Sequence, residues 1–301
     1  MVQMKFHSPV LLKETIEGLN INPEGVYVDA TFGGGGHTSY ILKKISTGRV
    51  YAFDQDKDAH ANKINDKRLK LIHANFRYLK NFLNYNGEEK IDGIIADLGV
   101  SSYQFDNYKR GFSTRHSSKI DMRMNVDSDL DAKQILNTYT QNEIANLLFC
   151  YGDFKNSRKI AEKIVKERDI QTITHTDQFS EILKDFYIER NKNKFLARVF
   201  QSLRIEVNDE INALKELLIS SSIMLKNQGR LVVLSYHSIE DRIVKNFINK
   251  GTLDGTIVKD FFGNQIKSFN AINKKAIVAQ KDEIKKNPRS RSVKLRIAEK
   301  I

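Results

Sequence analysis

Four consecutive glycines, Gly33 to Gly36, lie between an apolar stretch that ends in Asp29 and a segment of helical pattern that begins at His37. Glycine loses more conformational freedom on folding than any other residue, so such a run is costly unless the backbone requires it. One use is close approach to a ligand, whose polar groups can meet the free N–H groups at the start of a helix. A tight turn that needs positive φ is the alternative, although one or two glycines suffice for that.

Two further carboxylates follow apolar runs in the same way. Asp54 ends one run and Asp97 ends another, within "ADLGVSSYQF". An acidic residue at the first of these positions can accept hydrogen bonds from both ribose hydroxyls of an adenosine. Phe76 follows a third run, where its ring can pack on adenine or belong to the core. The pattern predicts an adenosine-type cofactor and suits NAD and S-adenosylmethionine equally, because the dinucleotide fingerprint fails at its third glycine, which is Thr38 here.

The elements that position these residues read as a parallel α/β sheet, because short apolar runs alternate with helical patterns. The strand candidates are 25–30, 49–54, 69–74, 91–99 and 229–237, with two weaker ones at 275–279 and 293–300. A long stretch of helical periodicity separates the fourth candidate from the fifth. A continuous helix is expected over about 195–226 as the crossover of the sheet, which leaves a candidate helical insertion between the two parts of the sheet.

Composition narrows the class of protein. The chain has 301 residues, of which 40% are hydrophobic, so a packed core is expected. Its single cysteine, Cys150, excludes a disulfide within the chain and is expected to be a buried structural thiol. No apolar run resembles a signal peptide or a membrane span, so a cytoplasmic protein is expected. The formal charge of +12 favours a nucleic acid partner, then an anionic membrane surface, and a merely soluble lysine-rich protein is the alternative.

Nine short motifs of the sequence resemble those of a known protein family. In order they are "HSPVLLKE", "DATFGGGGH", "FDQD", "DLGVSSYQFD", "RGFS", "DMRM", "FQSLRIEVNDEI", "SYHSIEDRIVK" and "NPRSRSVKLRIAE", spanning His7 to Glu299. Together they resemble the RsmH (MraW) family of bacterial small-subunit ribosomal RNA cytosine-N4 methyltransferases. The resemblance implies S-adenosylmethionine as methyl donor, a decoding-centre cytosine of 16S rRNA in the 30S subunit as acceptor, no metal, no membrane partner, and compatibility with a homodimer.

The same resemblance implies a class I, Rossmann-like methyltransferase fold. Its mostly parallel seven-stranded sheet would be built from residues 1–105 and 194–301, and an inserted all-helical domain, residues 106–193, would recognise RNA. By motif position the cofactor residues would be Gly34, Gly35, Gly36, His37, Asp54, Phe76, Asp97 and Gln104. Two positions depart from the family pattern: Gly34, where relatives often carry a larger residue, and Tyr103, where proline is common.

The residues expected to face RNA come from several segments. Residues 109–124, "KRGFSTRHSSKIDMRM", interleave basic groups with an aromatic ring, which suits phosphate contact and base stacking, and a solvated loop is the alternative. The predicted substrate residues are Arg110, Phe112, Arg123, Gln201, Arg204, Tyr236, His237, Ser238, Arg289 and Arg291.

The exocyclic amine of cytosine is a poor nucleophile, so the reaction requires acceptors for its hydrogen bonds. Asp97 and the backbone carbonyls of the "DLGVSS" turn are the candidate acceptors. Holding the cofactor only is the alternative role of Asp97. Methylation of ring carbon 5 would instead need a reactive cysteine. Two other functions stay open on the residues alone: a nicotinamide-dependent oxidoreductase on the same sheet, and an RNA-binding assembly factor without activity.

Overall fold

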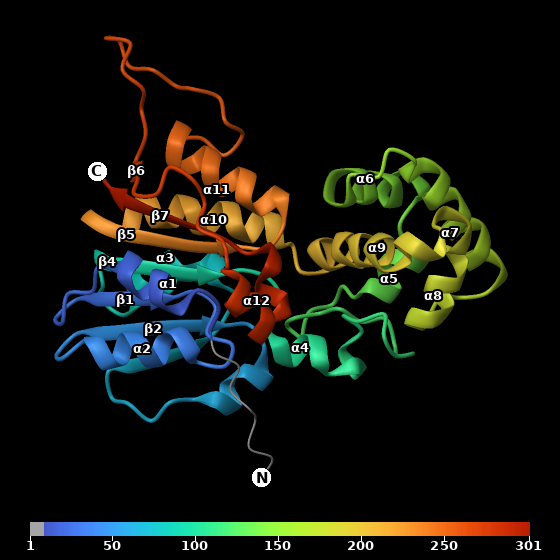
Figure 1. Cartoon of the computed structure of the whole chain (residues 1–301), viewed down its shortest axis with the longest axis horizontal. Coiled ribbons are helices and arrows are strands. Elements are labelled where there is room, and N and C mark those ends of the chain that lie inside the picture. Colours follow the sequence, from blue (N-terminus) through green and yellow to red (C-terminus); the bar gives the residue numbers. More distant parts are fainter. Residues whose placement is uncertain (1–8) are drawn as a thin grey trace. The chain divides into compact units, whose positions relative to one another are not determined.

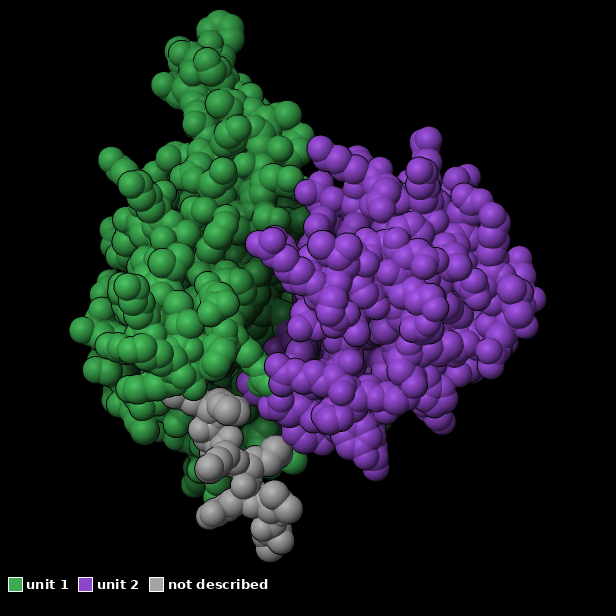
Figure 2. Space-filling model, turned by 45° about the vertical axis from the view of Figure 1, so that its right-hand side comes forward, with its two compact units in different colours: residues 1–99, 211–301 green, residues 100–210 purple. Residues whose placement is uncertain are grey.

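The computed structural model describes residues 9–301; the first two residues of the "HSPVLLKE" motif lie outside this range. The chain forms two compact units (Figure 2). One consists of residues 1–99 and 211–301, and the other of residues 100–210. We call them the sheet unit and the helical unit, and each is described by itself.

The sheet unit contains one seven-stranded sheet in the order β3-β2-β1-β4-β5-β7-β6 (Figure 1). The strands are β1 (Val26–Asp29), β2 (Arg49–Asp54), β3 (Leu69–His73), β4 (Ile91–Asp97), β5 (Leu225–Ser235), β6 (Phe269–Ala271) and β7 (Lys294–Lys300). Strands β1 to β5 are parallel to one another, whereas β7 runs antiparallel to both of its neighbours, β5 and β6. Strands β1, β2 and β4 are nearly continuous apolar runs because helices cover both faces of a parallel sheet.

Helices flank this sheet and complete its core. They are α1 (Leu12–Leu19), α2 (Gly36–Lys44), α3 (Leu79–Tyr85), α10 (Glu210–Met224), α11 (Ser238–Lys250) and α12 (Lys281–Lys286). Short 3-10 turns follow several strands: η1 (Lys57–Asn62), η2 (Phe76–Tyr78) and η6 (Pro288–Ser292). The core gathers buried side chains from helices and strands alike, among them Leu19, Ile41, Ile95, Leu234 and Leu295.

The helical unit is built from α4 (Ser102–Asp106), α5 (Ala132–Thr138), α6 (Gln141–Gly152), α7 (Ser157–Ile170), α8 (Thr176–Ile182) and α9 (Lys192–Val207), with turns η3 (Tyr108–Arg110), η4 (Lys184–Phe186) and η5 (Glu189–Asn191). Capping boxes start α4, α5 and α6, as in Thr140 with Glu143 before α6. Side chains at helical spacing, such as Ile144, Leu148 and Phe200, form its own apolar core. The unit therefore has an apolar core of its own.

The mostly parallel seven-stranded sheet and the helical insertion are confirmed, but two expectations about elements are wrong. The expected helix over 195–226 is interrupted, because α9 ends at Val207 and α10 begins at Glu210, with Asp209 at a φ of 47°. The helical unit therefore runs over 100–210, whereas we predicted 106–193. The candidate strand at 275–279 pairs with β7 only through Ile277, and β6 forms the edge of the sheet instead.

None of the helices in residues 9–301 combines the length and the apolar content that crossing a bilayer requires.

Candidate active site

The carboxyl ends of the parallel strands bring three carboxylates to one edge of the sheet. Asp29, at the end of β1, is in register with Ala52 of β2 and with Ile95 of β4. Asp54 and Asp97 each lie two residues farther along those neighbouring strands. The two carboxylates therefore stand at the same level on either side of the turn that follows β1, which is where open α/β sheets bind ligands.

Asp29 organises the turn and does not face a ligand. Its carboxylate accepts hydrogen bonds from the Thr31 amide at 3.1 Å and from the Thr38 hydroxyl, at the start of α2, at 2.6 Å. The residue is 1% exposed, and burial raises the pKa of its carboxyl group. Asp29 thus ties the end of β1 to the helix that the glycine turn leads into.

The four glycines serve different purposes. Gly33 and Gly35 have φ values of 52° and 73°, which favour glycine. A Cβ built at Gly35 would lie 2.9 Å from Cζ of Phe32, and one at Gly36 would collide with Pro9. At Gly33 the nearest atom would be a carbonyl oxygen 4.0 Å away. The packing of the protein itself therefore requires glycine at positions 35 and 36. The assignment of Gly34, Gly35 and Gly36 to the cofactor stays a prediction.

Asp54 is the carboxylate that fits a ribose. Its Oδ2 accepts from the Gly33 amide and its Oδ1 from the Asp56 amide, both at 2.8 Å. Each carboxylate oxygen accepts two hydrogen bonds, so one site on each remains for a hydroxyl group. Burial raises the pKa of Asp54 to about 6. Asn62 donates to the Gly33 carbonyl at 3.1 Å and fixes the other side of the turn.

Phe76 begins η2, directly after β3, and its side chain is partly exposed. Asn75 caps this turn through the Arg77 amide at 3.0 Å and donates to Gln55 at 2.9 Å. The ring therefore stands on a fixed backbone one strand away from Asp54, where it can cover a flat heterocycle.

Asp97 lies between two side chains that come from different elements. The Tyr236 hydroxyl, at the end of β5, donates to Asp97 Oδ1 at 2.8 Å, and His37 Nδ1 lies 3.9 Å from Oδ2. The other ring nitrogen of His37 donates to the Val10 carbonyl at 3.3 Å, since a carbonyl can only accept. The Asp97 amide donates to the Thr31 hydroxyl at 2.7 Å.

Burial is the main cause of the pKa shifts of Asp97 and Tyr236. Burial raises the pKa of Asp97, although the neighbouring His37 opposes this effect. Burial and the Asp97 charge raise the pKa of Tyr236 well above 10, so its hydroxyl stays a donor. The Asp97 side chain keeps 24% of its exposure, whereas His37 keeps only 5%. One carboxylate oxygen, Oδ2, therefore remains accessible while the other is held by the tyrosine.

Comparison with known protein families matches residues 4–301 to the MraW methylase family. The chain is 51% identical over 296 residues to a protein of Phocaeicola vulgatus named ribosomal RNA small subunit methyltransferase H, with 98% of this chain and 97% of that protein covered. It is 48% identical over 302 residues to a protein of the same name from Christiangramia forsetii, with 100% of both covered. The chain belongs to the MraW methylase family.

The MraW methylases are S-adenosylmethionine-dependent, so membership decides against a nicotinamide-dependent oxidoreductase. The fold is the class I, Rossmann-like methyltransferase fold, with the strand order given above. Among solved structures, an rRNA methylase from Streptococcus thermophilus is similar at 13% identity and a TM-score of 0.41, with 99% of both chains covered. A likeness of that size does not bear on the assignment, which rests on the family match.

At the end of β5 the structure of this MraW methylase reveals a residue that sequence reasoning missed. Glu240 is 3% exposed. Its carboxylate accepts from the Tyr236 amide at 3.1 Å and lies 3.1 Å from Nε2 of His237. His237 caps α11, whereas Ser238 is exposed. No capping-box pattern marked this glutamate in the sequence, because the residue three positions before it is a histidine and not a serine or threonine. The contacts give His237 a structural role at the start of α11.

Three predicted RNA contacts of the helical unit are occupied within the protein. Phe112 is 7% exposed and belongs to the apolar core. Arg110 is buried and donates to the carbonyls of Arg123 and Met124 at 2.9 and 3.1 Å. Arg123 forms a two-point ion pair with Asp121 at 2.8 and 3.0 Å. The expectation that Arg110 and Phe112 face RNA is wrong, because both are buried. The Arg123 side chain is partly exposed, so its contact with RNA stays a prediction.

Other residues of the same loop are accessible. Tyr108 is 48% exposed, and its ring lies 6.0 Å from that of His116. We call the exposed cations of this loop the exposed basic cluster: Lys109, Arg115 and Lys119. An exposed ring beside exposed cations is the arrangement that we expected of Phe112, Arg110 and Arg123.

The remaining predicted residues have mixed surroundings. In the helical unit, Arg204 forms a two-point ion pair with Glu210 at 2.7 and 2.9 Å, and Gln201 is partly exposed. Gln104 is buried and completes a capping box with Ser101 at the start of α4. In the sheet unit, η6 carries Arg289, which is partly exposed, and Arg291, which is exposed.

Cys150 is exposed on α6, so the expectation of a buried thiol is wrong. Ile144, Leu147 and Leu148 fill the buried face of α6, whereas Cys150 shares the outer face with Phe149. The position of a residue within an apolar-looking helix did not reveal which face it occupies.

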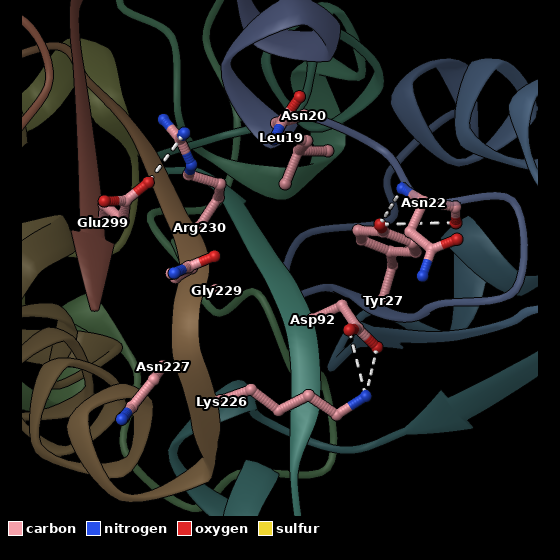
Figure 3. A pocket seen from close by; sticks show the side chains of 11 residues that line it. Leu19, Asn20, Asn22, Tyr27, Asp92, Lys226, Asn227, Gly229, Arg230 and Glu299 are labelled. Atoms are coloured by element: carbon pink, nitrogen blue, oxygen red, sulfur yellow. Dashed lines mark hydrogen bonds and ion pairs between the residues drawn. The ribbon is translucent and has the colours of Figure 1, made fainter. Parts of the chain in front are cut away.

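A cavity of about 360 Å³ lies at the opposite edge of the sheet, near the amino ends of β1, β4 and β5 (Figure 3). Its charged side chains neutralise one another: Lys226 pairs with Asp92 at 2.8 Å and Arg230 with Glu299 at 2.8 Å. It is remote from the carboxyl ends that carry Asp54 and Asp97, so the cofactor site of this methylase is not there.

Proposed function

We propose that this chain transfers a methyl group from S-adenosylmethionine to the exocyclic N4 amine of a decoding-centre cytosine in 16S rRNA. Relatives at about half identity carry the name ribosomal RNA small subunit methyltransferase H, and the resemblance of the sequence motifs adds the base and the atom. The observation that carries the chemistry is Asp97, whose Oδ2 is accessible while Tyr236 holds Oδ1.

The glycine turn and its neighbours fit the cofactor. Gly33 leaves open space where a side chain would stand, and Gly34 is exposed. The free acceptor sites of Asp54 suit the two ribose hydroxyls, and the partly exposed Phe76 suits the adenine ring. When bound, S-adenosylmethionine supplies an electrophilic methyl group, so the reaction requires no metal to activate the donor.

The protein must compensate for the weak nucleophilicity of the amine. Its lone pair is delocalised into the cytosine ring, and a carboxylate that accepts an amine N–H concentrates electron density on nitrogen. Asp97 Oδ2 is the acceptor that we assign to this hydrogen bond. Tyr236 and the Thr31–Asp97 backbone contact fix the orientation of the carboxylate, and its raised pKa suits it to take the proton that the amine loses.

The base must leave its stack to reach this carboxylate, and the surrounding RNA must be held by its phosphates. The exposed basic cluster and Tyr108 supply cations and a ring in the helical unit, and Arg291 supplies a cation beside the last strand. Contacts of this kind suit RNA because charge meets phosphate and rings stack on bases. We propose the 30S subunit or its RNA as the partner.

The decisive experiment incubates the protein with labelled S-adenosylmethionine and 30S subunits that lack the modification, and identifies the modified nucleoside by mass spectrometry. N4-methylcytosine is expected, with a severe loss of rate in Asp97→Asn. Asp92→Asn, at the other end of β4, is the matched control and should keep its rate if it folds. Cofactor binding without transfer would favour an assembly factor, and 5-methylcytosine would refute the proposed chemistry.

A further inference from the structure

A hairpin extends from the sheet unit between α11 and β6. We call residues 252–268 the projecting hairpin, and Figure 1 shows it reaching away from the sheet beyond α11. Its two arms pair through Lys259 and Gln265, and the Ile266 amide donates to the Val258 carbonyl at 2.9 Å. Figure 2 shows the same segment as a protrusion of the sheet unit.

Two phenylalanines occupy its tip. Phe261 is 97% exposed and Phe262 is 85% exposed. Their rings meet edge to face, with centroids 5.6 Å apart and planes at 86°. Phenylalanine is usually among the most buried residue types, so two adjacent rings in water mark an interaction site.

The tip is an ordered turn, so the rings are held outward by the backbone. The Asp260 carboxylate accepts from the amides of Phe262 and Asn264 at 2.9 and 2.8 Å. Those hydrogen bonds lower the pKa of Asp260. Gly263 completes the turn at a φ of 84°, and its amide donates to the Asp260 carbonyl at 3.1 Å. Such a turn presents the rings to a partner at little further cost in ordering.

The charges around the tip favour nucleic acid. Lys259 and Lys267 flank it, and within residues 9–301 neither lysine has an ion-pair partner. The two carboxylates of the hairpin are engaged: Asp260 in the turn, and Asp254 with the amide and hydroxyl of Thr256 at 3.0 and 2.9 Å. Available cations beside bare rings are the combination that binds phosphate and stacks on bases.

We propose that the projecting hairpin is an RNA contact separate from the active site, in which Phe261 and Phe262 stack on unpaired bases of the small-subunit RNA while Lys259 and Lys267 meet the adjoining phosphates. The hairpin also exposes Ile257, Val258 and Ile266. We favour RNA over a protein partner because lysines flank the two exposed rings, and cations beside aromatic rings suit phosphates and unpaired bases. This inference rests on the proposed function, since it takes the same RNA as the partner.

The first test compares the wild type with a Phe261→Ala/Phe262→Ala variant. Tyr85→Ala is the matched control, since this residue at the end of α3 is 87% exposed in the same unit. Affinity for 30S subunits is measured by sedimentation, S-adenosylmethionine affinity by calorimetry and molecular mass by light scattering. The double variant should bind subunits at least tenfold more weakly, about 1.4 kcal/mol, with unchanged cofactor affinity and mass, and the control should match the wild type.

The second test places p-benzoylphenylalanine at position 261 and irradiates the protein with 30S subunits. A cross-link that ribonuclease removes supports the proposal. A cross-link to a ribosomal protein or to a second copy of this chain, no cross-link at all, or a double variant that binds like the wild type overturns it. Methyl transfer by the wild type is scored separately, so an inactive protein that cross-links to RNA refutes the proposed function alone, whereas an active protein without that cross-link refutes the hairpin contact alone.

Discussion

The role of Asp54 makes a quantitative prediction about cofactor affinity and pH. An ionised Asp54 can accept hydrogen bonds from both ribose hydroxyls, whereas a protonated one loses an acceptor site. Burial raises the pKa of Asp54 in the free protein to about 6. The ionised form of Asp54, which can bind the ribose, is therefore lost as the pH falls through that value. If only the ionised form binds, the dissociation constant at pH 5 is about tenfold above its value near pH 7.5, a change of about 1.4 kcal/mol.

Calorimetry from about pH 5 to 7.5, in buffers with different ionisation enthalpies, measures both the affinity and the proton released on binding. Asp54→Asn is the control, because it lacks the titrating group while Asp29 and Asp97, whose pKa values are also raised, stay in place. The variant should bind weakly and with little pH dependence. A wild-type affinity that is flat over this range, or an Asp54→Asn profile as steep as that of the wild type, would refute the assignment of Asp54 to the ribose.

Three further predictions concern the turn, the RNA contact and the thiol. Gly35→Ala should lower the free energy of unfolding by about 1–3 kcal/mol more than Gly33→Ala in urea titrations, because both share left-handed strain and only the former overpacks; equal losses would contradict the packing argument. Replacing the exposed basic cluster with alanines should spare cofactor affinity and make the logarithmic salt dependence of RNA binding shallower by about 2, and an unchanged slope would exclude those side chains from phosphate contact. Cys150→Ala should retain methyl transfer and change stability by less than about 0.5 kcal/mol, since N4 methylation needs no thiolate; an inactive variant that still folds and binds cofactor would count against that chemistry.

The sheet was predictable because each buried parallel strand is a continuous apolar run in the sequence. Strand β2 has the predicted bounds, and β1, β3 and β4 differ by one or two residues, since each is an apolar run that ends at a polar group. The interruption between α9 and α10 was not predictable in this way. The apolar stripe continues through it, and the break is fixed by Asn208, which accepts from the Met124 amide at 2.7 Å and donates to the Met122 carbonyl at 2.8 Å. Contacts between residues so far apart in sequence leave no local pattern.

The residues of the candidate site likewise divide into those that local sequence places and those whose surroundings depend on the folded chain. Asp54 and Asp97 were predictable, because the end of a parallel strand places a side chain at the ligand edge whatever the rest of the fold does. The burial of Arg110 was not predictable, because the carbonyls of Arg123 and Met124 that it contacts come close only in the folded loop. Phe112 was expected to be exposed because its loop is polar, but it is buried. Cys150 was expected to be buried because its helix is apolar, but it is exposed.

The three carboxylates at the sheet edge show why residue type and strand position are not enough to assign chemistry. Each follows an apolar strand, and each is raised in pKa by burial. Their neighbours separate them. Asp29 accepts hydrogen bonds from a turn amide and a buried threonine hydroxyl, so it stabilises the turn. Each carboxylate oxygen of Asp54 accepts one hydrogen bond from a backbone amide and can accept a second from a ribose hydroxyl. Asp97 has one oxygen fixed by a tyrosine that stays protonated, and its side chain is partly exposed. These surroundings are the reason why we assign the amine hydrogen bond to Asp97 and not to Asp29 or Asp54.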